Sequence, residues 1–230
     1  MGRVIIQSEY THKKPITMIG TEAGICWGAD ITDQKKNYKR GIDCLENEHG
    51  RTFEFPDIYT IFDGYSARVI REWYTHIGGA PTRLQASTRY IDYEHGFAYI
   101  TPPSISSNGD ADLVYGKIMA YITDGLQKLD ALGVPREDSA LALPLGMETK
   151  IVDKRNLRNV IDMSHQRMCS RAYHEFRGLF ADYRAALSAY SDEWKYIVDN
   201  YLMPKCKYMG FCKERYTCGL MPRRGVAVHE

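Results

Sequence analysis

The sequence REWYTHIGGAPTRLQASTRY, residues 71–90, places charged, amide and hydroxyl side chains around a Gly-Gly-Ala-Pro break at 78–81. Gly supplies unusual φ angles and Pro cannot continue a helix, so the break predicts a turn. Before it, Val69, Ile70 and Trp73 have helical spacing and predict a helix that runs into the turn. The Arg, Gln and Ser side chains suit a phosphorylated, planar ligand, because Arg can bind phosphate through two parallel hydrogen bonds. A solvated basic loop is an equally good interpretation of this composition.

The composition is that of an ordinary globular protein and argues against several classes. The chain has 230 residues, 44% hydrophobic and 26% charged, enough for one large domain or two small ones. Its net charge of +1 weighs against a nucleic-acid-binding protein. No run approaches the roughly 20 apolar residues of a membrane span, and the N-terminal MGRVIIQSEYTHKK lacks the apolar core of a secretory signal. We therefore expect a cytoplasmic protein without nucleic-acid or membrane partners, with its six cysteines reduced.

Hydrophobic spacing and turn residues predict the secondary structure of the remaining chain. Strands are expected at 3–6, 52–62, 90–93, 97–100 and 141–152, and helices over 15–27, 30–48, 66–74, 110–132, 135–138, 156–190 and 194–201. Internal repeats and low-complexity linkers are absent from the sequence. We therefore predict a single α+β domain over 1–203, followed by a Cys- and Arg-containing tail at 204–230.

The helix expected over 156–190 carries a polar face, formed by Asn156, Arg158, Asp162, His165, Arg167, Arg171 and His174. Charged groups on a helix are most often a solvated face, and that interpretation applies to any one of them. Two features favour function. Arg167 falls between residues of the apolar stripe, so its base is expected near the core. Asn156 and Arg158 lie at the helix start, where free N–H groups and the helix dipole favour an anion.

Four groups of residues together resemble the flavin-dependent thymidylate synthases, the ThyX family, over most of the chain. They are Arg71–His76, Gln85–Tyr90, the turn Gly133–Glu137 with Leu143–Leu145, and Asn156–Arg158 with Arg167. Any one group alone is a weak signal, so the resemblance depends on their common order and spacing.

The resemblance implies a fold, an assembly and a reaction. The implied fold is a ThyX-like α+β domain with a mixed or antiparallel sheet flanked by long helices. It assembles as a homotetramer with active sites at subunit interfaces. The implied reaction is the reductive methylation of dUMP to dTMP, in which methylenetetrahydrofolate supplies the carbon and NADPH reduces FAD. The cofactors carry the difficult chemistry, while the protein positions them and tunes charge.

The resemblance also implies roles for individual residues. It makes Arg167 the catalytic residue at the uracil ring, where a fixed guanidinium favours the ionised N3 form. The residues implied in nucleotide binding are Glu72, Gln85, Ala86, Ser87, Thr88 and Arg89, together with Arg167. Those implied in flavin binding are Thr52, Thr75, His76, Arg83, Gln85, Asn156, Arg158 and Asp162.

The chain departs from the family's R-H-R and S-x-N-x-x-S-x-R fingerprint. Thr75 stands in place of the first Arg, the turn after His76 is longer, and Ala140 replaces an arginine. Arg83 is a candidate substitute for a lost guanidinium, and Asp162 replaces an amide that often faces the flavin in the family. These changes leave two alternatives open: a ThyX-like flavoprotein acting on another pyrimidine nucleotide, and a nucleotide-binding homologue without catalysis.

The cysteines have no role in the implied reaction, and the resemblance requires no metal. Cys169 lies beside the apolar stripe with no motif around it, which favours a core thiol. Cys206, Cys212 and Cys218, with His229, form a possible zinc set, but their five-residue spacers differ from the usual spacing of two to four. Unligated thiols in the tail are the favoured interpretation.

Overall fold

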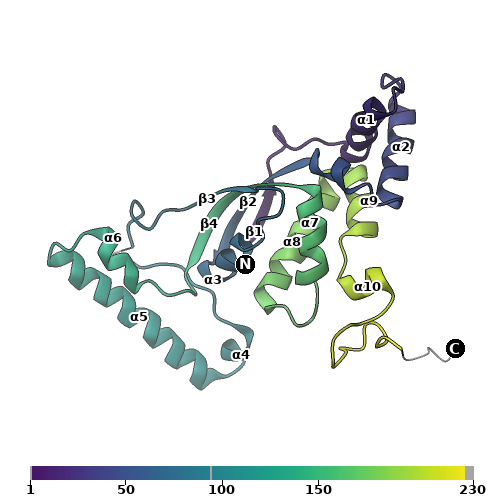
Figure 1. The fold of residues 1–230 in the computed structure, drawn as a ribbon. Coiled ribbons are helices and arrows are strands. Elements are labelled where there is room, and N and C mark those ends of the chain that lie inside the picture. Colours follow the sequence, from purple (N-terminus) through teal and green to yellow (C-terminus); the bar gives the residue numbers. More distant parts are fainter. Residues whose placement is uncertain (1, 94, 226–230) are drawn as a thin grey trace. The chain divides into compact units, whose positions relative to one another are not determined.

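The computed structural model describes residues 2–93 and 95–225 and has an α+β fold (Figure 1). Four strands form a sheet in the order β1-β2-β4-β3, with β1 at Arg3–Ile6, β2 at Asp57–Ser66, β3 at Thr82–Gln85 and β4 at Glu148–Asn156. The central pair is antiparallel. The amide of Leu157 donates to the carbonyl of Pro56 beyond one end of this pair, and the amide of Ala67 donates to that of Met147 beyond the other. The prediction of an antiparallel sheet is therefore confirmed.

Contacts within the chain group it into two compact units, and β2 and β4 each contribute residues to both. Unit 1 contains Phe62–Thr75 and Leu84–Ile151 with the first residues of the chain. Unit 2 contains Val4–Ile61, His76–Arg83 and the chain from Val152 onward. The predicted boundary between 203 and 204 stays a prediction.

Unit 1 is built around a short, well-capped helix. Its helical elements are α3 (Ala67–Tyr74), α4 (Pro103–Ser106), α5 (Gly109–Ala131), α6 (Arg136–Ser139) and the 3-10 turn η2 (Ala140–Ala142). Helix α3 begins where the hydroxyl of Ser66 accepts the amide of Val69 at 3.1 Å, an N-cap that stabilises the first turn. The ring of Trp73 is fully buried against Phe62, with centroids 4.6 Å apart. The helix predicted from the apolar spacing before the Gly78 turn is therefore confirmed.

Unit 2 holds most of the described helices, including the helix that ends at the predicted catalytic arginine. They are α1 (Pro15–Cys26), α2 (Gln34–Glu46), η1 (Gly50–Glu54), α7 (Leu157–Arg167), α8 (His174–Tyr190), α9 (Asp192–Tyr201) and α10 (Lys205–Met209). The buried faces of α7 and α8 meet in an apolar core that includes Leu157, Val160, Met163, Phe176, Leu179, Phe180, Tyr183 and Leu187. No helix in the described part of the chain combines the length and apolar character that a membrane crossing needs.

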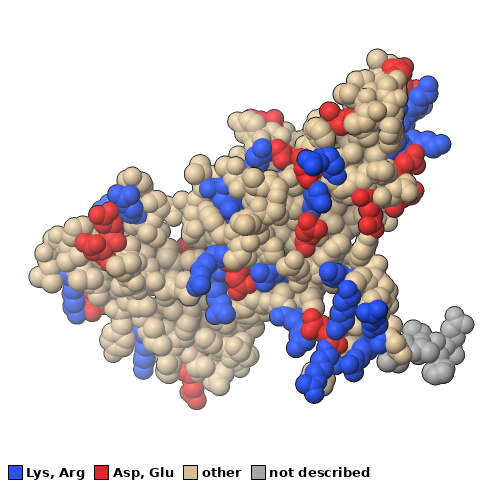
Figure 2. Space-filling view, in the orientation of Figure 1, with Lys and Arg blue, Asp and Glu red and all other residues tan. Residues whose placement is uncertain are grey.

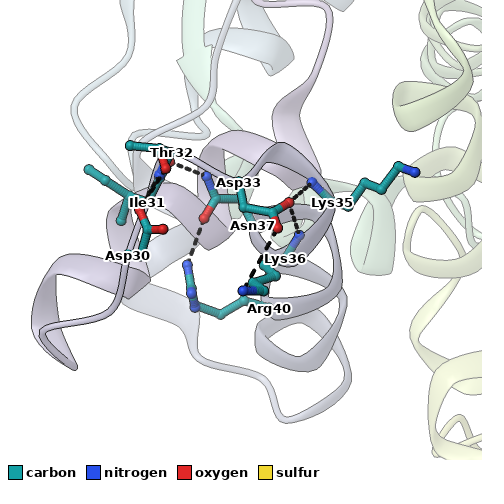
Figure 3. A network of polar contacts seen from close by, with 8 residues as sticks. All are labelled: Asp30, Ile31, Thr32, Asp33, Lys35, Lys36, Asn37 and Arg40. Atoms are coloured by element: carbon teal, nitrogen blue, oxygen red, sulfur yellow. Dashed lines mark hydrogen bonds and ion pairs between the residues drawn. The ribbon is translucent and has the colours of Figure 1, made fainter.

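Helices α1 and α2 pack closely because small residues face each other. A Cβ atom on Gly20 would lie 1.8 Å from the carbonyl oxygen of Asn37, so only glycine permits this approach. Figure 3 shows the polar network at the start of α2, where the Asp33 carboxylate accepts two amides of the first turn at 2.9 and 3.1 Å. Arg40 donates to the Asn37 side chain and to the Gly20 carbonyl, both at 2.8 Å. These hydrogen bonds stabilise the start of α2 and hold α1 and α2 together.

The structure corrects five secondary-structure predictions. The helix expected over 156–190 is two helices, because the chain turns at 168–173 while the apolar spacing stays in step across the turn. The strands expected at 90–93 and 97–100 are irregular, apart from an isolated bridge between Tyr99 and Met147. Strands β2 and β4 begin later than predicted, because η1 and η2 occupy chain that was expected to be extended.

Candidate active site

The junction of β4 and α7 positions the predicted site within unit 2. Asn156 ends the strand and caps the helix, since its side-chain oxygen accepts the Asn159 amide at 2.9 Å. The turn at Gly78 and Gly79 lies against this cap. Gly79 has a φ of +71°, and a Cβ there would fall 2.3 Å from the Asn156 amide nitrogen. Glycine is therefore required both by backbone conformation and by space.

Arg167 and His76, 91 positions apart in sequence, are hydrogen-bonded in this unit. The Nε of Arg167, the last residue of α7, donates to Nε2 of His76 at 2.8 Å. The guanidinium also lies over the ring of Phe176 in α8, 4.8 Å from its centroid. The edge of that ring packs on His76, with centroids 5.9 Å apart. Arg167 and His76, both predicted to be functional, thus pack on Phe176, which was predicted only as part of the apolar core.

The imidazole of His76 is neutral at physiological pH. Burial, followed by the positive charges of Arg167 and Arg155, lowers the pKa of His76 to about 4. Because Nε2 accepts from Arg167, the ring carries its proton on Nδ1. A neutral acceptor fixes the orientation of the guanidinium without cancelling its charge. Such a group can stabilise negative charge on a planar ligand.

A fully buried ion pair lies on the adjoining face of β4. Asp153 and Arg155 are each 1% exposed and are joined by two hydrogen bonds of 2.5 and 2.7 Å. Arg155 also donates to the side chain of Asn159 in α7 at 2.6 Å. Burial raises the pKa of Tyr183. The nearby charge of Arg155 lowers this pKa and that of Asp153 raises it, so the two charges oppose each other. Sequence reasoning missed this network, although Asp153 and Arg155 are two residues apart and so share one strand face.

A cavity of about 370 Å³ opens beside the start of α7. Among its lining residues are Arg158 and Asp162, both predicted to bind flavin, together with Gly50, Phe53, Tyr201 and Tyr208. Arg158 forms an ion pair with Glu54 at 2.6 Å. The hydroxyl of Thr52 donates to the carbonyl of His49 at 2.8 Å and so stabilises η1. The cavity offers a ligand the cation of Arg158, aromatic rings, and the carboxylates of Glu46, Glu48 and Asp162.

The residues predicted after the Gly78 turn are engaged within unit 1. The Ala86 backbone amide donates to the Lys150 carbonyl at 2.8 Å, beside β3, and its role in nucleotide binding stays a prediction. The side-chain amide of Gln85 donates to the Thr149 hydroxyl at 3.3 Å. Arg89 donates to Glu137 at 3.0 Å, with both side chains more than half exposed.

The hydroxyls of this group serve local turns. The Ser87 side chain accepts the Arg89 amide at 3.2 Å, and the Thr75 hydroxyl donates to the Glu72 carbonyl at 2.7 Å, where it caps the end of α3. Thr88 lines a small cavity of about 20 Å³. Arg83 lies on β3 in unit 2.

The structure therefore gathers one part of the predicted site. His76 and Arg167 meet directly, Asn156 caps the same helix α7, and Arg158 and Asp162 share a cavity beside it. Gln85, Ala86, Ser87, Thr88 and Arg89 form a second group in unit 1, where Glu137 is an unpredicted partner.

Comparisons with known proteins show the family of the chain. The family model described as "Thymidylate synthase complementing protein", Thy1, matches residues 6–189. The chain is 35% identical over 96 residues to the flavin-dependent thymidylate synthase of Geobacter sulfurreducens, covering 41% of each chain. It is 24% identical over 203 residues to that of Clostridium tetani, covering 78% of this chain and 80% of the relative.

The fold has a solved counterpart. The crystal structure of flavin-dependent thymidylate synthase ThyX from Helicobacter pylori, complexed with FAD and dUMP, superposes with a TM-score of 0.68 at 15% identity. The superposition covers 87% of this chain and 99% of that one. With the family model spanning most of its length, the chain belongs to the Thy1 family of flavin-dependent thymidylate synthases.

Proposed function

We propose that the protein is a flavin-dependent thymidylate synthase that converts dUMP to dTMP. Methylenetetrahydrofolate is the carbon donor in this proposal, and NADPH is the reductant. The observation that carries it is the Arg167–His76 pair, in which a neutral imidazole fixes a half-buried guanidinium at 2.8 Å. Charge stabilisation by a preorganised cation is what methylation at C5 requires, because electron density builds on the uracil ring.

The residues beside α7 fit FAD by their chemistry. The cavity of about 370 Å³ is in the range of ligand pockets, and Arg158 gives it a cation beside the helix start. Phosphate groups favour helix N-termini, and the exposed pair of Arg158 with Glu54 can exchange for a pair with phosphate. The residues proposed to bind FAD are Thr52, Thr75, His76, Arg83, Gln85, Asn156, Arg158 and Asp162, of which Arg158 and Asp162 line this cavity. Bound flavin would supply the reducing equivalents that convert the transferred carbon to a methyl group.

The remaining roles belong to this chain's own side chains. Arg167 orients the uracil and favours its anionic form. Ser87 and Arg89, with Glu72, Gln85 and Thr88, bind the sugar and phosphate, and Arg89 exchanges Glu137 for the phosphate. We propose a homotetramer with active sites at subunit interfaces.

Tritium release from dUMP labelled at C5 tests the reaction. Release that depends on both methylenetetrahydrofolate and NADPH is expected, together with FAD absorbance that NADPH bleaches without oxygen. The Arg167→Ala variant should lose release while keeping FAD, and the surface variant Arg3→Ala should keep both, since Arg3 only pairs with Asp63 at the surface. Flavin reduction without tritium release would indicate another pyrimidine nucleotide, and a chain that cannot be loaded with FAD would refute the proposal.

A further inference from the structure

Four of the six cysteines line one cavity in unit 2. The cavity has a volume of about 370 Å³ and receives Cys169 from the turn after α7, Cys206 from α10, and Cys212 and Cys218 from the chain that follows. All four are free thiols. Cys169 is half-buried on this cavity, so the prediction of a core thiol is wrong. The predicted partner His229 lies outside the described residues.

The backbone after α10 folds back on itself around Cys212. The amide of Cys212 donates to the carbonyl of Pro222 at 2.7 Å, and the amide of Arg224 donates back to the Cys212 carbonyl at 3.2 Å. Arg171 and Glu214 form an ion pair that ties this segment to the turn carrying Cys169. Cys212 is only 7% exposed as a result. The loop is therefore a closed structure and not an extended tail.

Positively charged side chains gather around this cavity. The chain over 204–225 contains six Lys or Arg and one Glu, and Figure 2 shows Lys and Arg gathered over this segment. Lys205, Lys213 and Arg167 also line the cavity. A bound centre with negative charge would be stabilised by these cations.

A single zinc ion and an iron–sulfur cluster require different distances between the four cysteine sulfurs. A single zinc ion holds four thiolates at about 2.3 Å, which brings the sulfurs to within about 3.8 Å of one another. Among the described residues, no three His, Cys, Asp or Glu groups converge in that way. In an iron–sulfur cluster each cysteine binds a different iron atom, so the four sulfurs lie further apart around a wider centre.

We propose that Cys169, Cys206, Cys212 and Cys218 ligate an iron–sulfur cluster that fastens the C-terminal segment to the end of α7. Four cysteines on one cavity supply the soft thiolate donors that such clusters require. Transfer of a preassembled cluster to the four thiols releases their protons to solvent and leaves the oxidation states of iron and sulfur unchanged. Cys169 is two residues from Arg167, so the centre would also hold the helix end that carries the predicted catalytic residue. The cavity proposed for FAD is its neighbour, and His165 lines both cavities.

Metal and sulfide analysis of the full-length protein tests the proposal. The chain would be purified without oxygen, or reconstituted with ferric iron, sulfide and excess dithiothreitol as the reductant, and then analysed for iron, acid-labile sulfide and zinc. About four iron and four sulfide atoms per chain are expected for a cubane cluster, with an electron paramagnetic resonance signal after reduction. Changing each of the four cysteines singly to Ser should lower iron and sulfide severalfold or to background. The matched variant Cys26→Ser should retain them, since Cys26 is exposed at the end of α1 and outside the cavity.

Three results would overturn the proposal. They are about one zinc per chain with no sulfide, disulfides among the four cysteines in the anaerobic protein, and iron and sulfide contents that the four substitutions leave unchanged. FAD content and circular dichroism, measured on the same samples, identify any variant that fails to fold. They also separate failure of this site from failure of the proposed enzymatic function.

Discussion

The guanidinium of Arg167 is oriented by His76, which accepts its Nε–H at 2.8 Å through a nitrogen that stays unprotonated at neutral pH. Removing the acceptor should therefore harm substrate turnover more than folding. We expect His76→Leu to lower kcat/KM for dUMP by about 10- to 100-fold, because a hydrogen bond to a charged group contributes about 1.5–3 kcal/mol. His76→Gln should recover part of the loss, since its side-chain carbonyl can accept the same N–H. Equal losses in both variants at equal FAD content would contradict this role.

The lowered pKa of His76 also predicts a pH dependence of stability. The unfolded chain binds a proton at His76 near pH 6.5, whereas the folded chain does so only near pH 4. Between these values the unfolded state holds more protons, so stability is fully present above pH 6.5 and falls as the pH decreases toward 4. His76→Gln, which does not titrate, should show a smaller decrease in the free energy of unfolding over this interval. Urea unfolding at pH 7, 5.5 and 4.5 measures the difference, and parallel profiles for the two proteins would refute it.

The buried pair of Asp153 and Arg155 predicts a large cost for removing one partner. Asp153→Ala leaves a guanidinium that is 1% exposed without its carboxylate, and such changes cost about 3–5 kcal/mol. The matched control is Lys154→Ala on the same strand, which breaks the partly exposed pair with Asp57 at 2.8 Å. The control should cost at most about 1 kcal/mol. Similar denaturant midpoints for the two variants would show that the buried pair contributes no more than the exposed one.

Sequence reasoning succeeded where signals are local. Apolar spacing located α1 and α5, and the side chain of Asn156 marked the start of α7. Reasoning failed where the outcome depends on partners far away in sequence. The turn at 168–173 has no Gly or Pro, so no local signal marks it. The turn allows Phe176 to pack on Arg167 and His76, and these contacts cannot be read from local sequence. The grouping of Cys169 with the C-terminal cysteines has the same origin, because no spacing rule connects residues 37 or more positions apart.

The close approach of Gly79 to Asn156 separates two costs of substitution. Gly79→Ala should destabilise the protein by roughly 1–2 kcal/mol because the backbone at this position is left-handed. A further cost is expected because the new Cβ would lie 2.3 Å from the side-chain amide nitrogen of Asn156, the cap of α7. Gly28→Ala is the matched control, since its φ is +60° and a Cβ there has no atom within 4 Å. The difference between the two variants in free energy of unfolding isolates the contact with Asn156. Equal values would mean that the cap adjusts without cost.

The exposed pair between Arg89 and Glu137 predicts competition with a nucleotide phosphate. If Arg89 binds the phosphate as proposed, Glu137→Gln should tighten dUMP binding by up to about 1 kcal/mol, because it removes a competing carboxylate from an exposed pair. Arg89→Ala should weaken binding by about 1.5–3 kcal/mol through loss of a charge-assisted bond. Asp138→Asn is the matched control, since it removes one negative charge from the same helix α6 without touching this pair. Isothermal titration of the FAD-loaded protein with dUMP measures all three. An unchanged affinity in Arg89→Ala, or equal tightening in Asp138→Asn and Glu137→Gln, would show that phosphate binding does not depend on this exchange.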